Sequence, residues 1–287
     1  MNPASGRGRG ARKLAAVRAA FDAAGGAVVR TTTTVENEGI LTRRAIEEGC
    51  TTLVAVGGDG TWSNVANALL HTRADVRLAL VAAGTGNDFA KSAGVPASDI
   101  AETTRLCFEG GDTRIDVGRV EDRFFLNAFG AGFDVAVLER CARTRWLRGD
   151  ALYLYSAVRE LRGYRGVDVA LAPADQAQRH LLLVVANGGR FGGSFRIAPQ
   201  ASLKDGLLDV VAIRNASTLR RARLFAAAVR GTHGAEPDVE VSRRAELRMT
   251  FAAPPAYEVD GEYCRASSDV LDVRCVPSAL RLVGGIG

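Results

Sequence analysis

Residues 52–61 read TLVAVGGDGT, a run of five apolar or β-branched residues followed by a glycine-rich turn. The first half predicts a buried β-strand, and the glycines predict a turn at its carboxyl end. The following residues, 61–70, predict a helix. A strand-to-helix turn of this kind directs backbone N–H groups and the positive end of a helix dipole at one point, which suits a phosphate group.

Asp59 lies within this turn and changes its interpretation. A carboxylate beside a phosphate would repel it, unless a divalent cation or a shared hydrogen bond lies between the two groups. The stretch therefore predicts a site for a magnesium-bound nucleotide.

The first 115 residues alternate between helical and strand-like patterns. Helices are expected near 11–24, 37–49, 61–70 and 98–108, and strands at 27–31, 52–56 and 78–82. Alternation of this kind favours an α/β fold with a parallel sheet covered on both faces. Met1-Asn2-Pro3 resembles the end of a strand, so we expect the first strand of this sheet to be missing from the sequence.

The pattern changes after Gly110-Gly111. Helices are fewer, and are expected near 134–143, 150–163 and 218–230. Short β-type runs occur instead at 113–129, 167–172, 180–187, 206–213, 239–251, 256–260 and 270–276. The sequence thus predicts two domains: an α/β nucleotide-binding domain at 1–113 and a strand-rich domain at 114–287, whose last residues pack back on the first domain.

Composition excludes several classes of protein. The 287 residues are 47% hydrophobic and 24% charged, as in an ordinary globular protein, and no apolar run approaches the ~18 residues of a membrane-spanning helix. The five cysteines are widely spaced without a CxxC pair, which favours reduced thiols in a cytosol. The net charge of +5 admits anionic partners, but 6% aromatic residues and no basic stripe argue against nucleic acid.

A second glycine turn, AGTGNDF at 83–89, follows the strand-like residues 78–81. Turns at the carboxyl ends of neighbouring parallel strands converge on one crevice, which would bring Asp59 and Asp88 together. The alternative is that Asp88 only caps the next helix. The sequence lacks the Gly-Lys-Ser/Thr run of a P-loop, the protein-kinase motifs and a GxSxG serine.

Six motifs in order identify a family resemblance: NPASG at 2–6, GGDGT at 57–61, GTGNDF at 84–89, RIDVG at 114–118, DGLLD at 205–209 and DGE at 260–262. Over essentially the whole chain, the sequence resembles the diacylglycerol kinase catalytic-domain family, specifically the soluble bacterial lipid kinases related to sphingosine kinases. GGDGT alone is shared with NAD kinases and phosphofructokinase relatives, whereas the last two motifs favour a lipid kinase. The resemblance implies an NAD kinase-like first domain and a β-sandwich-like second domain.

The resemblance also implies a nucleotide site between the domains. The positions that match the family's ATP contacts are Asn2, Pro3, Ala4, Ser5, Gly6, Arg7, Arg12, Thr33, Gly57, Gly58, Asp59, Gly60, Thr61, Trp62, Ser63 and Thr85. Many members have glutamate where this chain has Asn64, and relatives often have lysine where it has Arg7.

Catalytic and metal-binding roles follow from the same resemblance. Asp59, Asp88 and Asp116 match the acidic network at the active Mg²⁺, and Glu262 matches the residue assigned as proton acceptor. A structural cation site matches Asp205 with the backbone carbonyls of Ser202 and Leu207. Taken alone, Asp116 would be a turn residue at a strand end and Glu262 a solvated hairpin residue.

The function implied is transfer of the γ-phosphate of ATP to a lipid hydroxyl, with diacylglycerol converted to phosphatidic acid. A carboxylate such as Glu262 would accept the proton of the alcohol as the bond to phosphorus forms. The alternatives are a kinase of another lipid alcohol, either a sphingoid base or phosphatidylglycerol, and a nucleotide-binding regulator without catalysis. Retention of all four acids argues against the regulator.

The expected partners are a lipid at the membrane surface, with peripheral contact at the inner face of the membrane from the cytoplasm, and a second copy in a homodimer. Residues 140–148 carry four arginines around Trp146 and Leu147, a composition that suits an anionic bilayer. A solvated helix face with a Glu139–Arg143 pair explains the segment equally well. Both interpretations stay open on the sequence.

Overall fold

The computed structural model describes residues 1–32, 36–144, 147, 150–193 and 195–284. The helices are α1 (Ser5–Ala23), α2 (Glu36–Glu47), α3 (Asp59–Thr72), α4 (Asp88–Ala93), α5 (Ile100–Glu109), α6 (Phe133–Arg143), α7 (Asp150–Gly163), α8 (Thr218–Arg230) and the 3₁₀-helix η1 (His233–Ala235). The strands are β1 (Thr52–Gly57), β2 (Arg77–Ala82), β3 (Asp112–Val120), β4 (Arg123–Phe125), β5 (Ala128–Gly132), β6 (Val167–Leu171), β7 (Gln178–Ala186), β8 (Leu208–Arg214), β9 (Val239–Arg244), β10 (Glu246–Phe251), β11 (Ala256–Val259), β12 (Glu262–Arg265) and β13 (Val270–Val283).

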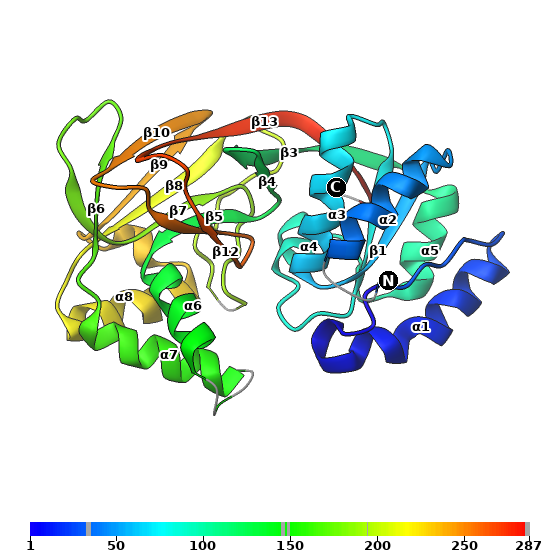
Figure 1. Cartoon of the computed structure of the whole chain (residues 1–287), viewed down its shortest axis with the longest axis horizontal. Coiled ribbons are helices and arrows are strands. Elements are labelled where there is room, and N and C mark those ends of the chain that lie inside the picture. Colours follow the sequence, from blue (N-terminus) through cyan, green and yellow to red (C-terminus); the bar gives the residue numbers. More distant parts are fainter. Residues whose placement is uncertain (33–35, 145–146, 148–149, 194, 285–287) are drawn as a thin grey trace.

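The chain forms two lobes joined by long strands (Figure 1). The first lobe holds β1 and β2 with α1 to α5, and the second holds the strands from β5 to β12 with α6 to α8. Strands β3 and β13 pair antiparallel and run between the lobes. At its end β13 also pairs in parallel with β2, where Arg281 and Leu282 lie beside Arg77 and Leu78. One continuous network of paired strands therefore extends through both lobes.

The first lobe is built on β1 and β2, which are parallel and in register from Thr52 to Gly57. Side chains alternate across β2: Leu78 and Leu80 face α3 and α4, whereas Ala79 and Val81 face α1 and α5. Because helices cover both faces of a strand in such a sheet, β2 is apolar from Leu78 to Ala82. The predicted α/β fold with a covered parallel sheet is confirmed.

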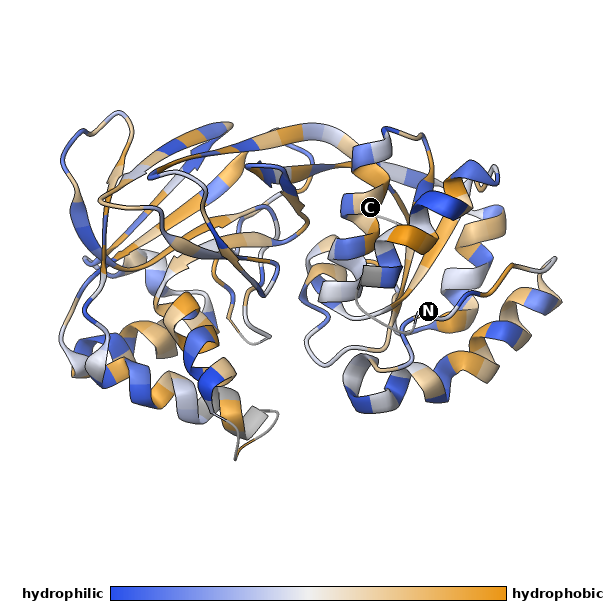
Figure 2. Cartoon of the chain, in the orientation of Figure 1, coloured by the Kyte–Doolittle hydropathy of each residue, from blue (hydrophilic) through white to orange (hydrophobic). Residues whose placement is uncertain are grey.

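The second lobe is organised around β7, which pairs antiparallel with β5, β6 and β8. Leu183 and Val185 point into a core formed between strands, whereas Leu182 and Val184 pack under α6 and α8. Successive side chains of a strand alternate between its faces, so one strand serves two cores. Figure 2 shows the apolar residues concentrated along these inner strands. The predicted strand-rich, β-sandwich-like domain is confirmed.

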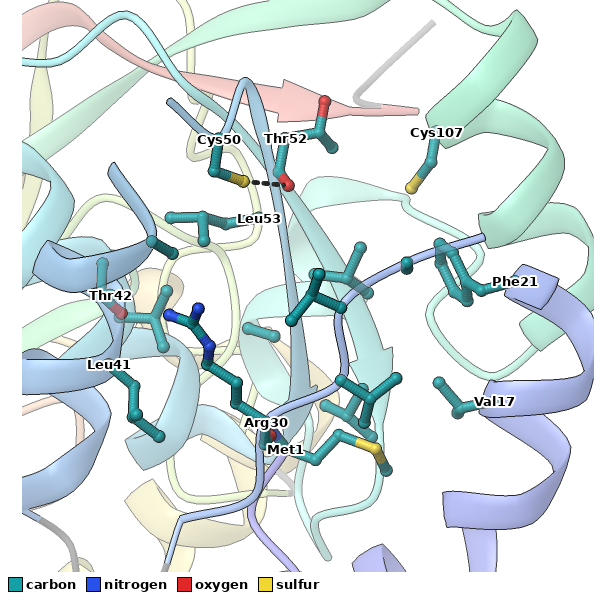
Figure 3. Close-up of a pocket in the computed structure, with 18 of the residues that line it drawn as sticks. Met1, Val17, Phe21, Arg30, Leu41, Thr42, Cys50, Thr52, Leu53 and Cys107 are labelled. Carbon is teal, nitrogen blue, oxygen red and sulfur yellow. Dashed lines mark hydrogen bonds between the residues drawn. The ribbon is translucent and has the colours of Figure 1, made fainter. Parts of the chain in front are cut away.

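The predicted strand at 27–31 is wrong, since these residues form no strand in the structure. A strand needs a neighbour with which to pair. The backbone here bonds instead to Met1, from the Met1 amino group to Arg30 O at 2.7 Å and, just after the segment, from Thr32 N to Met1 O at 2.8 Å, while the Arg30 side chain pairs with Glu48. Between it and the edge of β1 lies a cavity of about 630 Å³, lined by Val17, Phe21 and Leu53 among others (Figure 3).

Candidate functional site

The two glycine turns lie in contact at the carboxyl ends of β1 and β2. The carbonyl oxygen of Gly57 accepts hydrogen bonds from Ala83 N at 2.6 Å and Gly84 N at 3.1 Å. A Cβ atom on Gly58 would lie 2.8 Å from Gly84 Cα, so the two backbones approach more closely than any side chain allows. The prediction that these turns converge is confirmed.

Residues 2–6 fold over both turns. Asn2 donates through its backbone N to Val56 O at 3.0 Å and through Nδ2 to Thr61 Oγ1 at 3.1 Å. Gly6 has a φ of 56°, and a Cβ there would lie 2.0 Å from Ala83 O. The segment from Asn2 to Gly6, with Pro3, Ala4 and Ser5, is thus brought to the glycine turns as predicted for a phosphate-binding loop.

Basic side chains surround this loop. Arg7 is exposed with a φ of 62°, and Arg12 is exposed on α1. Arg9, which the sequence did not single out, donates through Nη2 to Thr85 Oγ1 at 2.9 Å and through Nε to Gly6 O at 3.1 Å. Arg9 is therefore the arginine fixed directly against the second turn. In the sequence, only its place in the Gly-Arg-Gly-Arg-Gly run at residues 6–10 pointed to this role.

Two predicted ATP contacts have buried side chains. The Trp62 and Ser63 side chains are completely buried, and Trp62 Nε1 donates to Ala55 O at 3.0 Å inside the first lobe. Trp62 packs in the core of the first lobe and Ser63 faces the Asp260 carboxylate, and their contact with ATP stays a prediction. Thr33, a third predicted contact, lies outside the described residues.

Asp59 and Asp88 lie close together at the first turns of α3 and α4. Asp59 Oδ1 accepts a hydrogen bond from Phe89 N at 3.0 Å, and Asp88 Oδ2 accepts one from Gly193 N of the second lobe at 2.5 Å. The Oδ2 atoms of the two acids lie 3.3 and 3.7 Å from the position of a Cβ on Gly86. The lack of a side chain at Gly86 therefore leaves room beside both carboxylates.

Burial raises the pKa of Asp59 to about 6. The hydrogen bond from Phe89 N opposes this shift, whereas the negative charges of Asp88 and Asp260 add to it. A carboxylate with like charges around it and little water favours binding of a cation, which would relieve the repulsion.

Asp260 is a site residue that sequence reasoning missed. Its carboxylate accepts hydrogen bonds from three consecutive backbone amides, Leu126, Asn127 and Ala128, at 2.9, 2.9 and 3.1 Å. Burial raises its pKa against these hydrogen bonds. The DGE motif contained this residue, but its left-handed φ of 49° and its position over β5 emerge only in three dimensions.

Glu262, two residues further on, begins β12 and forms an ion pair with Arg123. Its Oε1 lies 3.7 Å from the position of a Cβ on Gly60, so the carboxylate faces the amino end of α3. Its side chain is 34% exposed. The ion pair with Arg123 of β4 thus holds the predicted proton acceptor near the first glycine turn.

Asp116 lies on β3 and accepts two hydrogen bonds from backbone amides. Its Oδ1 accepts from Ser278 N at 2.8 Å and its Oδ2 from Gly206 N at 2.7 Å. Both oxygens therefore hold backbone segments of the second domain, and Asp116 does not line the pocket that contains Asp59 and Asp88. Strand β3 directs Asp116 at residues 203–207, and its place in one network with Asp59 and Asp88 stays a prediction.

The predicted structural cation site lies at the turn formed by residues 203–207. Asp205 is exposed, and its Oδ1 accepts a hydrogen bond from Leu207 N at 3.1 Å. The backbone N of Asp116 donates to Leu203 O at 2.7 Å, which fixes the turn between Ser202 and Leu207 against β3. In the described part of the chain, no three His, Cys, Asp or Glu side chains form a group suited to a metal ion.

Glu38 of α2 was also missed. This buried carboxylate accepts from Asn2 Nδ2 at 3.0 Å and from Asn64 Nδ2 at 2.9 Å. It thus places an acid beside Asn64, the position where many relatives of the family carry glutamate on α3. No feature of the sequence connected Glu38 to the site, since the two helices meet only in the fold.

A pocket of about 230 Å³ lies between the lobes. The first lobe contributes Asp59, Asp88 and Phe89 to its walls, and the second contributes Asp260, Asp134, Glu258, Leu138 and Phe191. Acids therefore line the pocket on both lobes, and the apolar side chains of Phe89, Leu138 and Phe191 line it as well.

The arginine-rich segment begins in α6. Arg140 pairs with Glu160 of α7, and Arg143, whose side chain is 80% exposed, lies 3.5 Å from Glu139. Arg145, Trp146 and Arg148 lie outside the described residues. Among the helices that the structure describes, none combines the length and the apolar character needed to cross a membrane.

Comparisons with known proteins agree with this geometry. Residues 1–120 match the diacylglycerol kinase catalytic domain, and residues 127–284 match the YegS C-terminal NAD kinase beta sandwich-like domain. A protein of Mycobacterium tuberculosis named diacylglycerol kinase is 29% identical over 98% of this chain and 93% of its own length. One from Bacillus subtilis with the same name is 27% identical over 91% and 88%.

Two further likenesses extend the comparison. A Pseudomonas aeruginosa protein named "Probable lipid kinase YegS-like" is 35% identical over 58% of this chain and 57% of its own. The crystal structure of a diacylglycerol kinase from Bacillus anthracis superposes with a TM-score of 0.72 at 19% identity, over 99% of this chain and 94% of that one. This last likeness shows a shared fold.

Proposed function

Because this chain belongs to the diacylglycerol kinase catalytic-domain family and is a lipid kinase, we propose that it transfers the γ-phosphate of ATP to the hydroxyl group of diacylglycerol, giving phosphatidic acid. One observation carries the proposal: two glycine turns with Asp59 and Asp88 adjoin a pocket between the lobes whose walls also include the apolar side chains of Leu126, Leu138 and Phe191.

The nucleotide phosphates would lie against the glycine turns. Backbone N–H groups at the amino end of α3 and the positive end of its dipole favour an anion there. Arg9, held by Thr85, places a guanidinium at the same turn, and Arg7 lies one residue before Gly8 in the loop above it. Guanidinium groups match phosphate oxygens in geometry as well as in charge.

Asp59 and Asp88 fit a magnesium ion. Mg²⁺ is typically bound by one or two carboxylates together with phosphate oxygens of a nucleotide, and it neutralises developing charge in phosphoryl transfer. The raised pKa of Asp59 and the open space at Gly86 are the observations that favour a cation here. Asp260 and the hydrogen bonds to its carboxylate would keep the second lobe in place over the ion.

The acceptor hydroxyl would enter from the second lobe. Glu262 faces the amino end of α3 and would take the proton of the alcohol, while Arg123 keeps its carboxylate in place. Phosphoryl transfer depends mainly on positioning and on neutralisation of charge, and these residues supply both.

The direct test uses purified protein, radiolabelled ATP and mixed micelles that contain one candidate lipid each. We expect phosphatidic acid to form from diacylglycerol faster than product forms from phosphatidylglycerol or sphingosine. Faster phosphorylation of phosphatidylglycerol or sphingosine would replace the proposed substrate, and the YegS-like relative makes another lipid alcohol the second candidate. Transfer to no lipid at all would refute the proposal.

Asp205→Ala is expected to remove most of the rise in Tm that Mg²⁺ produces in the absence of nucleotide. A cation that binds only the folded state stabilises it by mass action, and Asp205 is the one side chain predicted to ligate it at this turn. Thermal melts at several Mg²⁺ concentrations measure the effect. Asp175→Ala, in the exposed loop after β6, is the control. An unchanged Mg²⁺ response in Asp205→Ala contradicts the site.

We further propose that residues 140–148 bring the enzyme to anionic lipid at the cytoplasmic face of a membrane. Replacing Arg143, Arg145 and Arg148 by glutamine is expected to weaken binding to phosphatidylglycerol vesicles by ~10- to 100-fold, since each basic residue near such a surface contributes about 1 kcal/mol. Binding should also fall as salt is raised. Vesicle co-sedimentation measures both effects.

The matched control removes three exposed arginines from the first lobe, Arg18, Arg43 and Arg44, and so changes the net charge equally. Equal vesicle binding by the two triple variants would assign the 140–148 segment to an ordinary solvated helix.

A further inference from the structure

Two buried carboxyl groups at the second-lobe side of the pocket have no part in the phosphoryl transfer described above. Asp134 is the second residue of α6 and Glu258 lies in β11, and their residues are 6% and 2% exposed. A Cβ on Gly130 would lie 1.9 Å from Asp134 Oδ2 and 2.8 Å from Glu258 Oε1. The absence of a side chain at Gly130 is thus what allows the two acids to lie side by side.

Three of the four oxygens of these carboxyl groups lack a hydrogen-bond partner among the residues that the structure describes. Among the described residues, neither oxygen of Asp134 nor Oε1 of Glu258 makes a hydrogen bond, while Glu258 Oε2 accepts one from Gly261 N at 2.6 Å. Burial raises the pKa of both groups, and the charge of Asp134 adds to the shift of Glu258. A buried polar atom without a hydrogen-bond partner destabilises the folded state, which indicates a role beyond structure for this pair.

The surroundings limit what the pair can bind. The two acids line the same pocket as Asp59 and Asp88, and the walls between them include Leu126, Leu138 and Phe191 but no lysine or arginine. A molecule bound here would place oxygen atoms against the pair and apolar chains against these walls. Its other end would point to the acids at the glycine turns.

We propose that Asp134 and Glu258 bind the glycerol oxygens of an uncharged acylglycerol by hydrogen bonds and direct its free hydroxyl toward Asp59 and Asp88. A carboxyl pair that shares one proton has one O–H group, which can donate a hydrogen bond to an ester carbonyl of the acylglycerol. The two acids are positioning residues, since they contact the substrate away from the transferred phosphate. This inference rests on the proposed function and names the part of the site that would select its substrate.

The test replaces the pair by apolar side chains of similar size, Asp134→Leu and Glu258→Met, singly and together. Because three of the four carboxyl oxygens have no hydrogen-bond partner in the described part of the chain, these variants should fold with an equal or higher Tm. With dioctanoylglycerol as acceptor, we expect kcat/KM to fall by about 10- to 100-fold, mainly through KM, while the Kd for MgATP stays unchanged. Asp134→Asn, which still forms hydrogen bonds, should recover part of the loss.

A binding measurement separates this inference from the proposed reaction. Dioctanoylglycerol should raise the Tm of the wild type in the presence of a non-hydrolysable ATP analogue, and the double variant should lose this rise. Glu240→Met, which removes an exposed carboxylate of β9 outside the pocket, is the control. If the wild type binds dioctanoylglycerol but transfers no phosphate, the proposed function fails while the role of the pair stands.

Three results would overturn the inference. The first is transfer to dioctanoylglycerol with an unchanged KM in the double variant. The second is an equal loss of MgATP affinity, which would indicate a general disturbance of the pocket. The third is loss of sphingosine binding with dioctanoylglycerol binding retained, which would assign the pair to a cationic amine.

Discussion

Asp59→Asn is expected to lower the rate of phosphoryl transfer by at least about 100-fold while the protein remains folded. Asparagine keeps the size of the side chain and can still accept the hydrogen bond from Phe89 N, but it cannot neutralise a cation beside the phosphates. Removal of one preorganised electrostatic group from an active site typically costs ~10²–10³ in kcat. Initial rates with saturating lipid and MgATP measure the loss.

The same substitution should raise the stability of the free enzyme at pH 7. The pKa of Asp59 is about 6 in the folded state, above its ordinary 3.8, so its contribution to stability is complete below about pH 4 and is lost as the pH rises through 6. A shift of this size corresponds to roughly 2–3 kcal/mol. Asp59→Asn should therefore melt higher than the wild type at pH 7, and the two should converge near pH 4.

Asp75→Asn is the control for Asp59→Asn, because Asp75 is an exposed acid that pairs with Arg114 and Arg281 on the outside. A near-normal rate in Asp59→Asn would remove this residue from the metal-phosphate site. A lower Tm at pH 7 would show that the carboxylate stabilises the empty protein, contrary to the pKa argument.

Glu262→Gln should slow transfer by about 100- to 10,000-fold without loss of nucleotide affinity. Glutamine keeps the size and hydrogen bonding of the side chain but does not readily accept a proton, and losses of this order are typical when a general base is removed. The defect should lie in the chemical step, so single-turnover transfer from ATP to dioctanoylglycerol is the measurement that reports it.

Arg123→Gln separates the two possible causes of a defect in Glu262→Gln. It breaks the same ion pair but leaves the carboxylate in place, so it should retain much more activity. If both variants are equally slow, Glu262 acts by holding Arg123. If Glu262→Gln is nearly as fast as the wild type, the base lies elsewhere.

The fold of the first lobe could be predicted because local patterns and long-range packing agree there. The apolar run at 52–56 and the glycines after it specify both the strand and the turn, and the same holds for residues 78–86. Residues 27–31 have an equally strand-like composition, yet a strand depends on its neighbours, and composition does not say whether a neighbour is present.

The acids of the site also include some that the sequence predicts and some that it does not. Asp59 and Asp88 were predictable because they lie at the ends of adjacent parallel strands, a local feature with a known spatial consequence. Glu38, Asp134 and Glu258 were not predictable, since each comes from an element that meets the site only through the fold. Asp116 carried a recognisable motif, but the direction of its side chain depends on the turn at 203–207.

The return of β13 to the first lobe has a consequence for how the protein is made. Strand β2 lies between β1 and the end of β13, so the sheet that supports the glycine turns is completed by residues 281 and 282. During synthesis, residues 1–113 leave the ribosome long before residues 281 and 282. Until then, one edge of β2 remains unpaired. Folding of the nucleotide-binding lobe on the ribosome should therefore finish only when the whole second lobe has been translated, and chaperones should engage the nascent chain for that interval.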